Sequence, residues 1–300
     1  IQEGTVIKAQ KNRNTYIAVA QGGKLFVYGR ENNPVTITSN AENPQPGDWG
    51  GILLFGKAPI NSAAVDRSDL LDYFYGGDDT DDSSGFIRYL RVAYTGAAFN
   101  EDLSFNGLTL FGVGESTTFE YIQVLNSLGN GFRIVGGSVE PEKILSVNNE
   151  LSGVVLSDGW QGSVNSWFIK NSNKASLEII NNKFDALAEP ITSGTLIDIS
   201  SIGPSSTTGI LYTNGGGEVI MSNIYTSGLD VGIQIEGQTA TMHVDAGDLQ
   251  INPIEFNNTN SGFIKTNYTG PSNFFVEGDN LGAGIKSEIP AWASQWIIGF

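Results

Sequence analysis

Short stretches of alternating apolar and polar residues recur along the chain, and in its central part each stretch begins at a glycine. Four of these glycines, Gly85, Gly107, Gly131 and Gly153, are 22, 24 and 22 residues apart. Alternation with a period of two residues is typical of β-strands, and long windows with a helical period are hard to find. A repeat of this length predicts stacked coils of parallel strands, that is, a β-solenoid.

A second series of apolar segments keeps the same interval. Its leading apolar residues are 22 or 23 positions apart, in Tyr121–Val124, Ile144–Val147 and Trp167–Ile169. An asparagine follows each segment, and these residues are Asn126, Asn149 and Asn171. Because stacked amide side chains can hydrogen-bond from one coil to the next, we expect them to form an internal ladder.

The same rhythm covers most of the sequence, so we predict one domain over residues 1–300. Residues 57–84 interrupt the rhythm with an acidic insertion. Near the end, Pro290 and two tryptophans four residues apart predict a short amphipathic helix, and residues 288–300 are expected to cap the C-terminal end. The predicted fold class is all-β: a right-handed parallel β-helix with 22–24 residues per coil and a short C-terminal capping helix.

Charge and composition restrict the classes of partner. The chain has 32 acidic and 16 basic side chains, a formal net charge of −16, which disfavours nucleic acid as a partner. It has no cysteine, which excludes disulfides, thiolate metal sites and a cysteine nucleophile. Its longest apolar runs, such as Gly50–Phe55, are too short to span a bilayer as a helix. Because the sequence starts at Ile1 without methionine, any export signal or lipid-anchor cysteine is expected upstream of residue 1.

Several segments between residues 3 and 170 resemble segments of a known protein family. The more specific ones are Asp48-Trp49-Gly50-Gly51 and Asn106-Gly107-Leu108-Thr109-Leu110. Others are Glu3–Lys8, Tyr75–Gly77, Tyr89–Val92, Thr117–Val124, Gly131-Phe132 and Asp158–Gly162. In these segments the chain resembles a family of exported right-handed β-helix proteins that is common in Bacteroidetes, often found as surface lipoproteins and frequently mislabelled as multidrug transporters.

The chain departs from the pattern of that family at two places. Paired acids expected before Gly131 are replaced by Leu128-Gly129-Asn130, and an acidic run expected near position 150 is reduced to Asn149-Glu150. An ion site associated with those acids is therefore not expected here. The resemblance implies an exported β-helix attached to the extracellular side of the outer membrane, and it implies little about chemistry.

The insertion contains the densest group of carboxylates. Asp78, Asp79, Asp81 and Asp82 follow two glycines. Carboxylates at such spacing can converge on Ca²⁺, which takes about six to eight oxygen ligands. The spacing does not match the helix-loop-helix calcium pattern, so a calcium site and a solvated acidic loop remain alternatives.

Two kinds of catalysis are compatible with a β-helix. A pectate-lyase-type mechanism would use Ca²⁺ with an Arg such as Arg88, Arg91 or Arg133 as the base, although pairing of these residues with nearby acids is the structural alternative. Glycoside hydrolysis would need two carboxylates across a cleft, for which Asp158 or Asp198 would have to meet a partner on an adjacent coil. His243 is the only histidine, and we do not expect it to be catalytic.

Aromatic residues beside glycines and polar residues are the better lead to function. We expect Trp49, Tyr73, Tyr75 and Trp160 at turns or strand ends, where flat rings could stack on sugars or contact a partner protein. Packing at the corners of the coils is the structural alternative.

No nucleophile or acid/base pair stands out from the repeat. We therefore expect a non-enzymatic binding or scaffold protein at the cell surface, accessory to an outer-membrane glycan- or nutrient-uptake complex, with a surface glycan or a protein of that complex as partner. The alternative function is that of a polysaccharide lyase or glycoside hydrolase of the pectate-lyase-like β-helix type.

Overall fold

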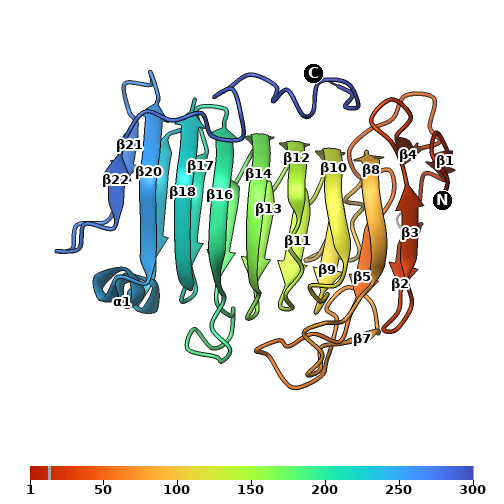
Figure 1. The fold of residues 1–300 in the computed structure, drawn as a ribbon, viewed down its shortest axis with the longest axis horizontal. Helices are drawn as coiled ribbons and strands as arrows, with labels where there is room; N and C mark the ends of the chain where they lie inside the picture. Colours follow the sequence, from red (N-terminus) through yellow and green to blue (C-terminus); the bar gives the residue numbers. More distant parts are fainter. Residues whose placement is uncertain (13–14, 300) are drawn as a thin grey trace.

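The strands form two long sheets that run the length of an elongated molecule (Figure 1). A computed structural model describes residues 1–12 and 15–299. Sheet A contains β1 (Val6–Ala9), β3 (Leu25–Tyr28), β4 (Val35–Ser39), β8 (Gly85–Ala93), β10 (Thr118–Ser127), β12 (Glu142–Asn149), β14 (Gln161–Ser172), β16 (Ser193–Ile202), β18 (Glu218–Ser227), β20 (Leu249–Asn257) and β22 (Phe275–Glu277). Sheet B contains β2 (Ile17–Val19), β5 (Ile52–Phe55), β9 (Leu108–Phe111), β11 (Phe132–Val135), β13 (Val154–Ser157), β15 (Ala175–Ile180), β17 (Thr208–Thr213), β19 (Val231–Glu236) and β21 (Ile264–Thr266).

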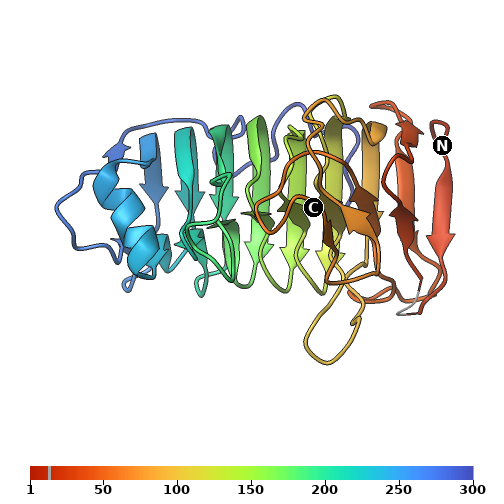
Figure 2. The ribbon, with the colours of Figure 1, turned by 90° about the horizontal axis from the view of Figure 1, so that it is seen from below.

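The chain alternates between the two sheets, and each coil pairs in parallel with the next. In sheet B, for example, Phe132 of β11 pairs with Leu108 of β9 and with Val154 of β13. This arrangement confirms the predicted right-handed parallel β-helix, and the two side views of the ribbon show the coils stacked along the long axis (Figure 1 and Figure 2). The short pair β6 (Asp66–Arg67) and β7 (Phe74–Tyr75), inside the insertion, is antiparallel.

The glycine rhythm has a steric cause in sheet B. Gly107, Gly131 and Gly153 directly precede β9, β11 and β13 and lie against one another. A Cβ on Gly131 would lie 2.6 Å from the Gly153 carbonyl oxygen and 2.0 Å from the Ser146 Oγ, so no larger residue fits there. Gly85 does not belong to this column, because it lies in sheet A and pairs with Leu25. Its spacing of 22 residues from Gly107 is therefore a coincidence of the sequence.

The long strands of sheet A bend around the core. From β8 to β18 they are 8 to 12 residues long, and each bends at a residue with a positive φ between 49° and 63°. The residues at these bends are Tyr89, Tyr121, Lys143, Ser166, Asp198 and Asn223. The bend divides each of these strands into two straight parts. On the outer side of the bend the rings of Tyr89 and Tyr121 stack, with their centres 4.4 Å apart.

The core fills the space enclosed by the two sheets. Inward-facing residues of successive coils form one continuous apolar cluster, from Ala9 to Phe274. The tryptophans Trp49, Trp160 and Trp167 belong to it and are fully buried.

An asparagine ladder runs along one corner, as the sequence predicts, but with a different middle member. Asn148 donates from Nδ2 to Asn126 Oδ1 at 3.1 Å and accepts from Asn171 Nδ2 at 3.0 Å. All three residues have φ of 56° to 58°, a conformation that asparagine tolerates better than most residues. Asn149, the predicted member, points inward and donates to Ser146 Oγ at 2.9 Å.

Replacing Asn148 by alanine should lower the free energy of unfolding by about 2 kcal/mol. The substitution removes two hydrogen bonds and places an alanine at positive φ, each of which costs on the order of 1 kcal/mol. Urea unfolding measures the change. The matched control is Asn173→Ala, because the Asn173 side chain is exposed and donates to the Glu150 carboxylate at 2.7 Å, and the variant should change stability by less than about 0.5 kcal/mol. Equal effects at the two positions would contradict a stabilising role for the ladder.

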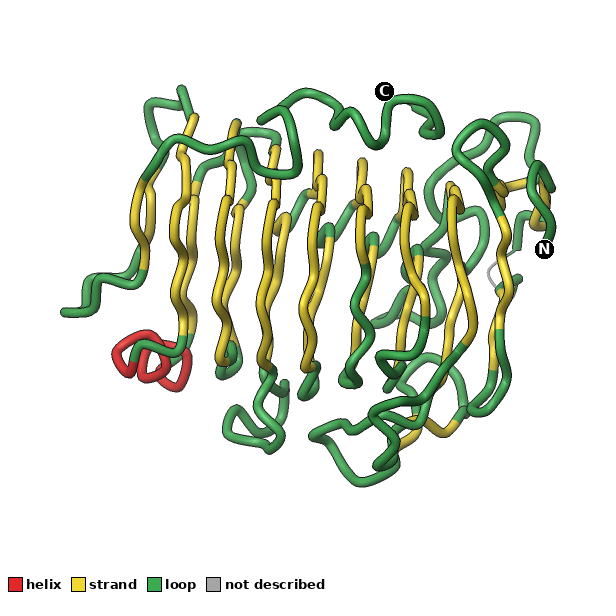
Figure 3. The backbone as a smooth tube through the Cα atoms, viewed as in Figure 1, coloured by secondary structure: helices red, strands yellow, loops and turns green. Residues whose placement is uncertain are grey.

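The helix lies elsewhere than the sequence indicates. α1 (Gln238–Ala246) is inserted between β19 and β20, where Ala240 and Val244 pack against the core cluster. Residues 290–297 form turns and not the predicted helix (Figure 3). Backbone groups of this segment and of the residue after it pair with side chains of sheet A. Arg91 donates to the Trp296 carbonyl, Gln123 Nε2 donates to the Ile298 carbonyl at 2.8 Å and Gln123 Oε1 accepts from the Ile298 amide at 3.0 Å. No helix in the described ranges is long and apolar enough to cross a bilayer.

We call residues 278–299 the C-terminal strap, because this segment runs back from the last coil along the outer side of sheet A toward β10 and β8 (Figure 1). Ala283, Ala293 and Trp296 of the strap form a second buried cluster with outward-facing residues of sheet A, namely Ala93, Leu125, Leu145, Val147 and Phe168. Ser200 Oγ donates to the Lys286 carbonyl at 2.8 Å. The strap thus covers an apolar strip along the side of the solenoid and does not close its end.

Candidate functional site

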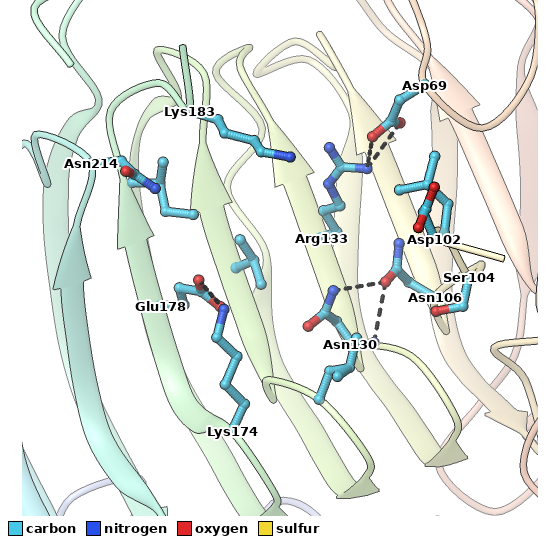
Figure 4. Close-up of a pocket in the computed structure, with 14 residues that line it drawn as sticks. Asp69, Asp102, Ser104, Asn106, Asn130, Arg133, Lys174, Glu178, Lys183 and Asn214 are labelled. Atoms are coloured by element: carbon cyan, nitrogen blue, oxygen red, sulfur yellow. Dashed lines mark hydrogen bonds and ion pairs between the residues drawn. The ribbon is translucent and has the colours of Figure 1, made fainter. Parts of the chain in front are cut away.

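The outer face of sheet B bears an open groove of about 460 Å³ (Figure 4). Strands β11, β13 and β15 supply Arg133, Val155 and Glu178 to its floor. Its sides come from the insertion, from residues 102–104 before β9 and from the segment after β15, which supplies Lys183. The groove therefore lies where loops from three coils flank one sheet.

The floor residues are in register with one another. Arg133 pairs with Val155, and Val155 pairs with Glu178, so the three side chains project outward from adjacent coils. Adjacent parallel strands lie about 4.8 Å apart. Arg133 and Glu178 consequently lie on one line parallel to the solenoid axis, with the apolar Val155 between them.

Arg133 connects the floor to the insertion. Its Nη1 lies 3.0 Å from Asp69 Oδ1 and 2.8 Å from Asp69 Oδ2, and its guanidinium lies 5.6 Å from the centre of the Phe111 ring. The Arg133 side chain is 23% exposed. It is thus held in place by a carboxylate and an aromatic ring, with part of its surface open to the groove.

Glu178 is a nearly buried carboxylate, with its side chain 6% exposed. Lys174 Nζ lies 2.6 Å from Oε1, and Ser152 Oγ donates to Oε2 at 2.7 Å. A buried charge is tolerated only when it is paired and hydrogen-bonded, and both conditions are met here.

Amide side chains complete the near side of the groove. Asn130 Nδ2 donates to Asn106 Oδ1 at 2.8 Å, and the Asn130 carbonyl Oδ1 accepts from the Ser152 amide at 2.9 Å. On the far side, Lys183 extends over the floor in the direction of Arg133 (Figure 4). Donors and acceptors thus surround the floor on both sides.

The charges in the groove balance. Three basic residues, Arg133, Lys174 and Lys183, lie with three acidic residues, Asp69, Asp102 and Glu178. Such a surface can exchange hydrogen bonds with the hydroxyl groups of a sugar. Two of the carboxylates are held in ion pairs, Asp69 with Arg133 and Glu178 with Lys174.

The aromatic residues predicted as contacts are mostly buried. Trp49 Nε1 donates to the Ala93 carbonyl at 2.9 Å and Trp160 Nε1 donates to the Val139 carbonyl at 2.9 Å, and both rings are fully buried. Tyr75 is 5% exposed and its ring packs against Phe111, while Tyr73 is half-buried and stacks on Phe55. The expectation that Trp49, Trp160 and Tyr75 present a contact surface is therefore wrong, because their rings fill the coils and anchor the insertion.

The acidic residues of the insertion do not gather around one point. Asp78, Asp79 and Asp81 are exposed, whereas Asp82 is buried, and this burial raises the pKa of its carboxyl group. Asp81 instead hydrogen-bonds to Glu115, which raises the pKa of Glu115. Within residues 1–12 and 15–299 there is no group of three or more acidic or histidine side chains that could hold a metal ion. The predicted calcium site at these four aspartates is thus not supported.

The other catalytic candidates have structural partners. Arg88 lies 3.0 Å from Glu120, and Arg91 donates to the Trp296 carbonyl in the strap. Asn223 Nδ2 donates to Asp198 at 2.5 Å, and His243 Nδ1 lies 2.7 Å from Asp248 in and beside α1. Burial raises the pKa of Asp158, which accepts from Asn182 at 3.4 Å beneath the insertion.

This groove was not predicted from the sequence. Arg133 was considered only as a possible base, and Lys174, Glu178, Lys183 and the amide pair were not singled out. One local signal was available, because Lys174 and Glu178 are four residues apart on an otherwise apolar strand segment. When charged residues occupy the same outward position on neighbouring coils, they form a polar face of the solenoid.

The comparisons with known proteins agree with the coil architecture. A family model described as a pectate-lyase-like beta helix domain matches residues 1–297. A comparison with curated proteins found no match.

Two solved structures are similar to the chain at low identity. One is an alginate lyase from Paenibacillus sp. str. FPU-7, with 13% identity, 92% of each chain covered and a TM-score of 0.31. The other is the catalytic domain of a GH87 alpha-1,3-glucanase in complex with nigerose, with 10% identity and a TM-score of 0.30. That match covers 92% of this chain and 64% of the glucanase domain.

Proposed function

The chain belongs to the pectate-lyase-like β-helix domain family, and on this basis we propose that it binds a linear polysaccharide along the outer face of sheet B. The observation that carries the proposal is the groove, in which Arg133, Val155 and Glu178 project from adjacent coils in register. The coil spacing of about 4.8 Å is close to the length of one sugar unit in an extended glycan. Successive sugars would therefore meet equivalent positions on successive coils.

The proposed setting is the extracellular side of the outer membrane of a Gram-negative cell. There the protein would be an exported, lipid-anchored accessory of a glycan- or nutrient-uptake complex. The resemblance of residues 3–170 to exported surface proteins of Bacteroidetes supports this setting.

The second candidate function is depolymerisation of the same glycan. It is favoured by the basic residues of the groove, because a lyase needs a basic group to abstract a proton. Asp69 pairs with Arg133 and Glu178 pairs with Lys174, so Lys183 is the basic residue of the groove that has no carboxylate partner within residues 1–12 and 15–299. A product assay on the same glycans separates the two functions.

Replacing Arg133 by glutamine should lower the affinity for the bound polysaccharide at least about tenfold. A charge-assisted hydrogen bond contributes on the order of 1.5–3 kcal/mol, and each 1.4 kcal/mol is about a factor of ten in Kd. Affinity electrophoresis against a panel of soluble neutral and acidic polysaccharides first identifies the ligand, and calorimetry then gives the affinities.

The matched control is Arg67→Gln, since Arg67 pairs with Asp72 on the exposed part of the same insertion. It should bind as the wild type does. If no polysaccharide retards the wild-type protein, or if Arg133→Gln binds equally well, the groove is not the binding site. Release of unsaturated or reducing ends that is lost in Lys183→Ala would assign the second function instead.

A further inference from the structure

A second candidate binding surface lies at the N-terminal end of the solenoid, on sheet A and outside the groove. Three aromatic rings meet there on the outer face of β3 and β8. The ring centres of Phe26 and Tyr28 are 6.1 Å apart with an angle of 13° between the planes, and those of Tyr28 and Phe86 are 5.4 Å apart with an angle of 29°. We call these three residues the aromatic platform.

The platform is open to solvent. Phe26 is 43% exposed and Tyr28 is 46% exposed, in contrast to the buried tryptophans at the coil corners. Exposed apolar patches with a polar rim are uncommon on soluble proteins unless they bind something. Register explains why the rings gather: Phe26 pairs with Phe86, and Tyr28 follows Phe26 by two residues on the same face.

A depression of about 280 Å³ adjoins the platform and is lined by Tyr28, Phe86 and charged residues. Arg30 Nε lies 2.6 Å from Glu3 Oε2, and Arg88 Nε lies 3.0 Å from Glu120 Oε1. Each positive charge at the rim is therefore offset by a carboxylate, while planar donors and acceptors remain for hydrogen bonding.

We propose that the aromatic platform and its depression bind a neutral pyranose oligosaccharide, independently of the sheet B groove. The three rings stack in nearly parallel planes and are partly open to solvent, so they provide an apolar surface on which the C–H face of a pyranose can pack, and the rim provides partners for its hydroxyl groups. Both arginines at the rim are paired with carboxylates, which favours a neutral sugar over a uronate. A nucleic-acid ligand would be repelled by the net charge of −16.

The test is a calorimetric titration of the wild-type protein. The ligands are neutral hexasaccharides of glucose and mannose in several linkages, and hexagalacturonate is the charged comparison. At least one neutral hexasaccharide should bind, and more tightly than hexagalacturonate. Tyr28→Ala and Phe86→Ala should each lower that affinity at least about tenfold, because each removes a ring against which the sugar packs. Tyr28→Phe keeps the ring and should stay within about twofold of the wild type.

Two controls keep the proposal distinct from the sheet B groove and from general effects of exposed rings. The titrations are repeated in an Arg133→Gln background, which weakens the groove, so that the remaining binding and its loss in Tyr28→Ala report on the platform. Phe184→Ala removes a ring that is 92% exposed and lies away from the platform, and it should also leave this binding unchanged.

Three results would overturn the proposal. The first is that no neutral hexasaccharide binds to the wild-type protein. The second is binding that survives both alanine variants, whose folding is checked by Tm. The third is a dimer in sedimentation equilibrium that Tyr28→Ala dissociates, since the platform would then be an interface between two copies of the chain.

Discussion

Replacing Trp296 by alanine should lower the free energy of unfolding by about 3–5 kcal/mol, the usual range for removing a large aromatic side chain from a core. Trp296 is fully buried, although it lies near the end of the chain. Its ring meets Tyr89 edge-on at 5.8 Å and Tyr121 at 6.4 Å, and its Nε1 donates to the Trp292 carbonyl at 2.9 Å. Alanine would keep none of these contacts.

Trypsin gives a second measurement of the same variant. Lys286 is the one basic residue of the C-terminal strap, and in the folded protein it is paired with Glu255 and Asp279. Once the Trp296 contacts are lost, the strap should detach and the bond after Lys286 should become accessible. We expect Trp296→Ala to be cleaved there much faster than the wild type, with the coils remaining intact.

The control for this prediction is Ile298→Ala. Ile298 is 36% exposed, and its bonds to Gln123 involve only backbone atoms, so this variant should behave almost as the wild type does. A Trp296→Ala protein with unchanged stability and unchanged resistance to trypsin would show that the strap is not held by this ring.

Replacing Trp160 by alanine should have an effect of similar size, about 3–5 kcal/mol, for a different reason. The ring fills a corner of the core, where the glycines of two adjacent coils lie against it: a Cβ on Gly162 would be 2.9 Å from the ring and a Cβ on Gly194 would be 2.8 Å from it. The indole is thus enclosed by backbone that cannot collapse readily into the cavity left by alanine. Loss of the bond to the Val139 carbonyl adds an unpaired buried acceptor.

This second variant also distinguishes a structural role from a contact role. At a temperature where Trp160→Ala remains folded, its affinity for the polysaccharide per folded molecule should equal that of the wild type. Phe184→Ala, at an exposed position, should change stability by less than about 0.5 kcal/mol. Loss of binding in Trp160→Ala without loss of stability would mean that Trp160 contacts the ligand.

The coil architecture could be predicted because it depends on local, repeated constraints. Glycine at Gly107, Gly131 and Gly153 is required by the approach of the next coil, and the apolar residues after each of them must face the core. Both constraints recur once per coil and are therefore visible as a period in the sequence. For the same reason the sequence predicted that asparagines of successive coils form a ladder, although its middle member is Asn148 and not Asn149.

The direction of an aromatic side chain could not be predicted in this way. Trp160 and Tyr28 both lie next to small or polar residues, yet Trp160 is fully buried and Tyr28 is 46% exposed. Whether a ring points in or out depends on where the chain turns relative to the sheet, and this turn is set by contacts between coils. The aromatic platform could not be predicted because the sequence does not distinguish the exposed aromatic residues of β3 from other strand residues.

The groove and the strap were missed because they join distant parts of the sequence. Asp69 and Arg133 are 64 residues apart, and Gln123 and Ile298 are 175 residues apart. The pattern of Pro290 and two tryptophans fits an amphipathic helix when it is considered alone. Its backbone instead takes its partners from sheet A, and no local property of residues 290–297 specifies that choice.

The path of the strap has a consequence for how the protein is made. A ribosome delivers the chain from its N-terminal end, so the early coils can stack while the later ones are still being synthesised. The apolar strip formed by Ala93, Leu125 and Leu145, however, is covered only by residues near the other end of the sequence. That strip must stay uncovered until nearly the whole chain has left the ribosome, and during this interval it is a surface on which a chaperone can act and on which nascent copies can aggregate.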